Sequence, residues 1–370
     1  MSTSSYKGVP IPKGWSMGTS QTQNRPYFYH RSSQHTQWHF PTPAEAKDPV
    51  GTKAKMKKLQ DFKRKMKQKS DASDSSSSRP AKSLKPANVN ANANPSTGNS
   101  LAIIVPYRDL HASQQRAKHL AKFTPHMKQF LSNLKSQNKI QDYHIYIIEQ
   151  SDDQRKFNRG KLLNIGFDYA LQRSTRHPPK HNVFIFHDVD LLPDRDLEDW
   201  YARYPTIPTH IARVWDRYAN NPKYFGGIVS FSEEDMKRIN GYPNTFWGWG
   251  GEDDEMQNRL EALGIRFDAP AKGTIRDLED MDLNTKIQFL KKNKQWKCMC
   301  KWEALDEHKT TWRKNGLEDL DYEILGVRSL DGGDGDEDGG ESKVTMVTAD
   351  VKLNGNHWAN EKCGVDYMPY

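Results

Sequence analysis

A ten-residue segment, 246–255, combines residue types that can bind and activate a sugar. It reads Phe-Trp-Gly-Trp-Gly-Gly-Glu-Asp-Asp-Glu, so two indoles and three glycines lead into four consecutive acids. Glycines let a backbone approach a ligand closely. The flat faces of Trp247 and Trp249 can stack on a sugar ring, and a carboxylate beside them can take a proton from a sugar hydroxyl. An acidic run alone is more often a solvated loop or the start of a helix. The combination nevertheless favours a carbohydrate-handling site.

A second acidic motif follows a short apolar run. Residues 182–186 are Asn-Val-Phe-Ile-Phe, which predicts a buried strand. Asp188 and Asp190 come directly after it, where open α/β sheets bind ligands. Hard oxygen ligands of this kind suit a Mn²⁺ or Mg²⁺ ion that holds a diphosphate. A lone Asp-x-Asp often does no more than end a strand, but the acidic Trp-Gly segment later in the chain strengthens the metal interpretation.

Further motifs surround these two in a fixed order. They are 103–108 (Ile-Ile-Val-Pro-Tyr-Arg), 143–150 (Tyr-His-Ile-Tyr-Ile-Ile-Glu-Gln), 157–167 (Phe-Asn-Arg-Gly-Lys-Leu-Leu-Asn-Ile-Gly-Phe), 224–227 (Tyr-Phe-Gly-Gly), 240–255 and 315–317 (Asn-Gly-Leu). On these motifs, residues from about 100 to 351 resemble the β-1,4-galactosyltransferase family, glycosyltransferase family 7. The segment is most similar to the xylose-acceptor branch, the xylosylprotein 4-β-galactosyltransferases, through 123–127, His187 and Glu255.

The resemblance implies an α/β domain with the GT-A fold, a Rossmann-like nucleotide-binding fold, over residues 100–355. It also implies a metal-dependent, inverting enzyme that moves galactose from UDP-galactose to a hydroxyl of a xylose-like or other glycan acceptor. Residues 356–370 are then a C-terminal tail. The alternative is a scaffold protein whose transferase fold binds sugar or nucleotide without turnover.

Roles follow for the residues that match family motifs. Asp253 matches the catalytic base, and Glu252 and Asp254 flank it. The donor side is predicted to be Pro106, Arg108, Phe157, Arg159, Asp188, Val189 and Trp249. The acceptor side is predicted to be Tyr224, Gly227, Trp249, Glu252 and Asp254. The bulk of Tyr224 favours galactose over N-acetylgalactosamine in the donor.

The metal positions depart from the family pattern. Asp190 matches the direct ligand, but Asp277 and Glu279 stand where the family places histidines. Alternate residues of a strand point the same way, so both carboxylates can face one ion. An all-oxygen set favours Mn²⁺ or Mg²⁺. The alternative is that these are surface acids and that metal binding is weakened or lost.

Residues 8–43 independently resemble a WW domain, an all-β module of three short strands. The motifs are 11–15 (Ile-Pro-Lys-Gly-Trp), 25–29 (Arg-Pro-Tyr-Phe-Tyr) and 36–41 (Thr-Gln-Trp-His-Phe-Pro). The resemblance gives Trp15 and Pro41 a structural role. It implies that Tyr27 and Trp38 form a groove for a proline-rich peptide in the polyproline II conformation. The alternative is a module that folds but binds nothing.

Residues 44–99 are predicted to be a linker. Its first part, 53–69, carries nine Lys or Arg residues and one acid, an excess that equals the formal net charge of +8 of the whole chain. This segment is predicted to be a solvated helical spacer, with contact to nucleic acid or anionic lipid as the alternative. The Ser-, Asn- and Pro-rich remainder has the composition of a disordered segment.

Localisation is predicted from what the sequence lacks. No apolar stretch reaches the roughly 18 residues needed to span a bilayer, and residues 1–7 do not resemble a signal peptide. Cys298, Cys300 and Cys363 are an odd number and suggest no disulfide framework, so we expect partly buried thiols. Two cysteines alone make no metal site. Together with the WW module, these features predict a cytoplasmic or nuclear protein.

Overall fold

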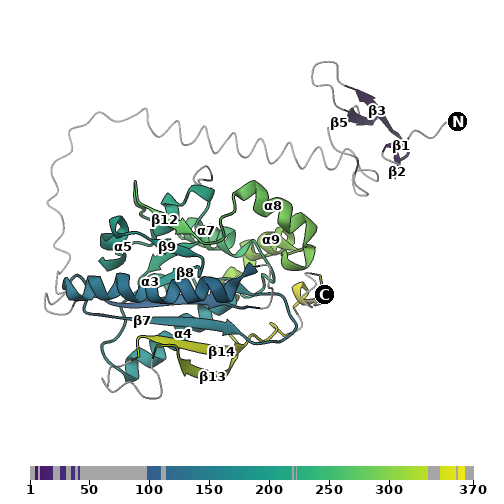
Figure 1. Ribbon diagram of the computed structural model, residues 1–370. Helices are drawn as coiled ribbons and strands as arrows, with labels where there is room; N and C mark the ends of the chain where they lie inside the picture. The colour runs from purple at the N-terminus through teal and green to yellow at the C-terminus, as the bar shows by residue number, and fades with distance from the viewer. Residues whose placement is uncertain are drawn as a thin grey trace, which may run out of the picture. The chain divides into compact units, whose positions relative to one another are not determined.

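The computed structural model describes residues 5–6, 9–19, 26–30, 35–37, 41, 98–109, 114–218, 221, 223–331, 342–355 and 357–362. The chain divides into two compact units, Met1–Ala91 and Asn92–Tyr370 (Figure 1). The linker segment 53–69 lies outside the described residues. The expected domain limits at 8–43, 44–99, 100–355 and 356–370 stay a prediction.

The first unit contains a small antiparallel sheet of the kind expected for a WW domain. Its strands are β3 (Trp15–Thr19), β4 (Pro26–His30) and β5 (His35–Gln37), with β4 in the centre. Trp15, Phe28 and Pro41 are buried, whereas Tyr27 is partly exposed. Strands β1 (Ser5–Tyr6) and β2 (Val9–Pro10) form a separate pair. Trp38, the second groove residue, lies outside the described residues.

The second unit is built on a seven-stranded mixed sheet in the order β10-β11-β8-β6-β7-β14-β13. The strands are β6 (Ser100–Tyr107), β7 (Asp142–Gln150), β8 (Val183–His187), β10 (Thr209–His210), β11 (Ile228–Phe231), β13 (Glu323–Ser329) and β14 (Val344–Asp350). The four central strands β8, β6, β7 and β14 are parallel, and the outer strands join antiparallel. This mixed α/β architecture confirms the predicted fold class.

The central strands are buried on both faces, which explains their continuous apolar sequences. Successive side chains of β6 enter opposite cores: Ala102 and Ile104 pack on one face, and Leu101 and Ile103 on the other. Strands β7, β8 and β14 alternate in the same way.

The second unit also contains helices, some of which pack on the two faces of the sheet. They are α3 (Arg116–Ser136), α4 (Arg159–Arg176), α5 (Glu198–Ala202), α6 (Glu233–Arg238), α7 (Glu252–Ala262), α8 (Leu283–Lys292), α9 (Lys301–Thr311) and α10 (Ala359–Lys362). Helix α4 contributes to the core that contains Ile104, and α3 to the core that contains Ile103. In Figure 1, α3 runs alongside the sheet, where β7, β14 and β13 are neighbours. A two-stranded pair of β9 (Leu191–Pro193) and β12 (Ile275–Asp277) lies outside this sheet.

Helix α4 approaches the sheet closely at Gly166. A Cβ atom added there would lie 2.4 Å from Ile104 Cγ2 and 2.8 Å from Ile148 Cγ1. Alanine is normally the better helix residue, but here it has no space. We therefore expect Gly166→Ala to lower the free energy of unfolding by about 1–3 kcal/mol in urea denaturation. Thr175→Ala, on the exposed side of α4, is the control and should cost little; equal effects of both variants would contradict this packing.

Candidate active site

A cavity of about 360 Å³ opens at the carboxyl ends of the parallel strands β6, β7 and β8. Pro106 and Arg108 reach it from the end of β6, Phe157 from the segment after β7, and Asp188 and Asp190 from the end of β8. This is the edge at which open α/β sheets bind ligands. The structure thus brings together the predicted donor-side residues, and Val189 and Trp249 line the same cavity.

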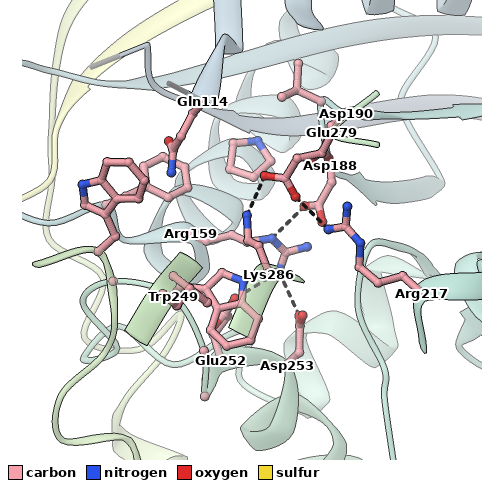
Figure 2. Close-up of a pocket in the computed structure, with 18 of the residues that line it drawn as sticks. Gln114, Arg159, Asp188, Asp190, Arg217, Trp249, Glu252, Asp253, Glu279 and Lys286 are labelled. Carbon is pink, nitrogen blue, oxygen red and sulfur yellow. Dashed lines mark hydrogen bonds and ion pairs between the residues drawn. The ribbon is translucent and has the colours of Figure 1, made fainter. Parts of the chain in front are cut away.

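Arg159 joins the two acidic motifs of the sequence. It is the first residue of α4, which is capped by the Asn158 side chain accepting a hydrogen bond from the Lys161 amide. Its Nε donates to Asp188 Oδ1 and its Nη1 to Asp253 Oδ1, each at 2.8 Å (Figure 2). Glu252 Oε1 lies 3.8 Å from the same Nη1. One buried guanidinium therefore holds carboxylates from β8 and α7 beside each other.

Burial dominates the protonation of these acids. It raises the pKa of Asp253 well above the ordinary value of 3.8, although Arg159 acts in the opposite direction. Burial likewise raises the pKa values of Asp188 and Glu252, again against the opposing charge of Arg159. A carboxylate with a raised pKa is a stronger base, so Asp253 has the electrostatic setting of a proton acceptor.

The acidic run 252–255 is the first turn of α7, where negative charge is favoured by the helix dipole. The helix-start interpretation is therefore correct, yet the four acids have different surroundings. Glu252, Asp253 and Asp254 line the cavity. Asp254 is half exposed and pairs with Lys301 at 2.6 Å. Glu255 is buried away from the cavity and pairs with Arg259 at 3.3 Å.

Gly226 and Gly227 shape the wall behind Asp253. A Cβ on Gly226 would lie 2.1 Å from Asp253 Oδ2, so no side chain fits there unless the carboxylate moves. Gly227 has φ +73° and is outside the cavity wall; its carbonyl accepts a hydrogen bond from the Asp188 amide at 2.9 Å. Tyr224 lines the cavity and stacks on Tyr218, with ring centroids 4.0 Å apart. Gly227 thus supports Asp188 through its backbone, and its predicted acceptor contact stays a prediction.

The two tryptophans of the motif have different positions. Trp247 is fully buried in the core, so the expectation that both indoles offer a face to a sugar is wrong for it. Trp249 lines the cavity and is 37% exposed. Gly248, Gly250 and Gly251, with φ between +90° and +114°, make the turn that directs the two rings differently.

The predicted metal ligands are engaged by basic side chains. Asp190 Oδ2 accepts from Arg116 Nη1 at 2.7 Å, and Asp277 pairs with Arg217. Glu279 pairs with Arg116, Arg217 and Lys286. Strand β12 ends at Asp277, so Glu279 lies beyond it, yet Arg217 contacts both carboxylates, which therefore face the same cluster. In the described part of the chain, no group of three or more His, Cys, Asp or Glu side chains is arranged to hold a metal ion. The residues present do not fit a divalent cation.

Arg116, Arg217 and Lys286 were not anticipated from the sequence, although all three line the cavity. They belong to no recognisable motif. The carboxylates at 277 and 279 are the only signal, because acids in place of histidines need a compensating charge when buried.

The mixed α/β sheet, with a cavity at the carboxyl ends of its parallel strands, defines a domain of the GT-A type. Comparison with known protein families supports this fold assignment. Residues 53–202 match the N-terminal region of glycosyl transferase group 7, residues 206–283 match a domain described as the N-terminal domain of galactosyltransferase, and residues 11–41 match the WW domain. The chain belongs to the β-1,4-galactosyltransferase family and carries a WW domain, as predicted.

Curated relatives are similar over part of their length. Mouse beta-1,4-galactosyltransferase 4 is 32% identical over 231 residues, which are 61% of this chain and 59% of the relative. Mouse beta-1,4-galactosyltransferase 1 is 34% identical over 62% of this chain and 51% of the relative. The chain therefore spans between half and three fifths of the length of these relatives.

A solved structure of the catalytic domain of Drosophila beta1,4-galactosyltransferase 7 with xylobiose is similar to most of this chain. It is 28% identical, has a TM-score of 0.53, and the match covers 70% of this chain and 96% of that one. A mutant of the same fly protein, with the same identity, coverage and TM-score, was crystallised with manganese, UDP-Gal and xylobiose.

The predicted cytoplasmic or nuclear location is wrong. The homologous family 7 galactosyltransferases are Golgi enzymes. The composition-based inference failed because it relied on the absence of an apolar segment. Within the residues that the structure describes, no helix is long and apolar enough to cross a membrane.

The cysteine prediction also needs correction. Cys300 is disulfide-bonded, and Cys363 lies outside the described residues. Cys298 is a buried thiol, and burial raises its pKa to about 11. A disulfide suits a secretory compartment better than the cytosol.

Cys300 is close in sequence to Trp296 and Cys298, whose backbones hold Trp249 in place. The Trp249 amide donates to the Trp296 carbonyl at 2.6 Å, and the Cys298 amide donates to the Trp249 carbonyl at 3.1 Å. We expect reductant to lower the free energy of unfolding by about 2–4 kcal/mol. Cys300→Ser should show the same loss and no further response to reductant. An unchanged urea midpoint after reduction of the parent chain would contradict this expectation.

Proposed function

We propose that this protein is an inverting galactosyltransferase that moves galactose from UDP-galactose to a hydroxyl of a sugar acceptor. The observation that supports it most is that Asp253 and the Arg159–Asp188 pair open onto one cavity. The fly relative that binds UDP-Gal and xylobiose supports the same donor and a xylose-like or other glycan acceptor.

In the proposed reaction, Asp253 takes the proton of the acceptor hydroxyl. The hydroxyl oxygen bonds to the anomeric carbon of galactose while the bond from that carbon to UDP breaks. UDP leaves with the electron pair, and one displacement inverts the anomeric centre. No step is assigned to a divalent ion, because the three expected ligands are paired with basic side chains.

Other residues of the cavity have the chemistry to orient the two sugars. Trp249 offers a partly exposed ring, and Tyr224 is held in place by its stack on Tyr218. Glu252 Oε2 is buried and accepts no hydrogen bond among the described residues, so it is available to a sugar hydroxyl. Asp254, at the rim beside Lys301, is proposed to contact a more distant part of the acceptor. Pro106, Arg108 and Phe157 are proposed to hold the uridine diphosphate from the other side.

The WW unit is proposed to bind a proline-rich peptide through the face that carries Tyr27. The Tyr27 and Tyr29 rings lie 6.1 Å apart, and both are partly exposed on β4. Such a contact would raise the local concentration of an acceptor attached to the peptide.

Asp253→Asn tests the catalytic assignment. The variant keeps the size of the side chain but cannot take a proton, so transfer should fall by about 10²–10⁴-fold. UDP-galactose binding, measured by calorimetry, should persist. Full activity of the variant would contradict the role of Asp253. Absence of transfer in the parent chain, with nucleotide binding retained, would favour the scaffold alternative.

The activity of the parent chain is expected to depend on pH in a way that the activity of Asp253→Asn does not. Because the pKa of Asp253 is raised above 3.8, the active, deprotonated form is lost as pH falls through that raised pKa. The kcat/KM profile should therefore show an acid limb above pH 3.8, which Asp253→Asn should lack. Glu261→Gln removes a charge from the exposed side of the same helix and is the control; it should keep the parent profile.

A further inference from the structure

Three cations from distant parts of the chain meet at the carboxylates where a metal was expected. Arg116 begins α3, Arg217 lies in a short 3-10 helix, Asp216–Tyr218, and Lys286 lies in α8. They pair with Asp190, Asp277 and Glu279, so three positive charges oppose three negative ones. Figure 2 shows Arg217 and Lys286 converging on Glu279.

The arrangement excludes a divalent ion for electrostatic reasons. A cation bound to Asp190 would have to displace Arg116, whose Nη1 lies 2.7 Å from Asp190 Oδ2. The ion would then stand among buried positive charges, which repel it strongly where water is excluded. Arg116 also donates from Nη2 to Glu279 Oε1 at 3.2 Å, so it holds two of the three expected ligands. The negative charge of Asp190 is thus already balanced by Arg116.

The cationic side of the cavity suits a diphosphate. Arg217 is almost completely buried, and its Nε makes no hydrogen bond among the described residues. Arg159 Nη2 is also buried and lacks an acceptor in the same part of the chain. Both side chains line the cavity together with Arg116 and Lys286. Guanidinium groups match phosphate oxygens in shape and charge, so the open donors point to an anionic ligand.

We infer that Arg116, Arg217 and Lys286 take the place of the divalent ion and bind the diphosphate of the donor through their N–H groups. This inference rests on the proposed function. As the bond between galactose and UDP breaks, the electron pair moves to the β-phosphate oxygen. Arg217 and Lys286 stabilise the charge that develops there, and no metal or other reactant is needed. Transfer by this chain is metal-independent, in contrast to the manganese-containing complex of the fly relative.

Calorimetry and transfer assays on the full chain test the inference. UDP binding and galactose transfer are measured after EDTA treatment, in EDTA and in Mn²⁺. The inference expects a UDP Kd that agrees within about twofold between the two conditions, with transfer in both. Binding or transfer that needs Mn²⁺ overturns the inference and leaves the proposed function intact. Absence of UDP binding in both conditions overturns both.

A pair of variants on one helix assigns the effect to Lys286. Lys286→Met keeps the aliphatic stem and removes the charge, so UDP binding in EDTA should weaken by at least about tenfold, as expected for a lost charge-assisted hydrogen bond. Lys291→Met makes the same change at an exposed position of α8 and should bind UDP like the parent. Equal affinities of the two variants would overturn the assignment. Thermal melting of each variant shows whether it is folded, and the EDTA comparison on the parent chain does not depend on either.

Discussion

The candidate site depends on a buried guanidinium, that of Arg159, between two carboxylates. Asp188 directly follows the central strand β8, and Asp253 lies in the first turn of helix α7, more than sixty residues later. Each accepts a hydrogen bond from Arg159 at 2.8 Å. Without that charge, two buried acids would repel each other and take up protons. Arg159 therefore fixes the relative position of the two motifs, and its charge opposes the burial that raises the pKa of the proposed base.

Buried carboxylates are paired with basic side chains on the other side of the cavity as well. Each acid of the expected metal site has a basic partner, so the negative charge of these carboxylates is balanced by side chains of the protein itself. Buried pairs of this kind are costly to break because the remaining charge is left without a partner. An anionic ligand can be accepted where donors remain open, as at Arg217 Nε and Arg159 Nη2. The family fold thus carries a charge arrangement that differs from the histidine-containing pattern expected of the family.

Some parts of the fold and the site could be predicted from short stretches of sequence. The apolar run before Asp188 became strand β8, and the motif at 224–227 placed Tyr224 in the cavity wall. Local sequence could not distinguish Trp247 from Trp249, because two indoles around one glycine look alike until the core selects one. Nor could it find Arg116, Arg217 and Lys286, which share no local context and meet only in the folded chain. The disulfide of Cys300 was missed because an odd number of cysteines reveals no pairing.

The central claim is that the charge of Arg159 holds the pKa of Asp253 below the value that burial alone would give it. It is tested most directly by a ¹³C NMR titration of the Asp253 carboxyl group in the parent chain and in Arg159→Gln. Because the charge of Arg159 opposes the effect of burial on this carboxyl, its removal should raise the pKa of Asp253 further, so the carboxyl titrates at a higher pH in the variant. An unchanged or lowered pKa in a folded Arg159→Gln protein would contradict the claim.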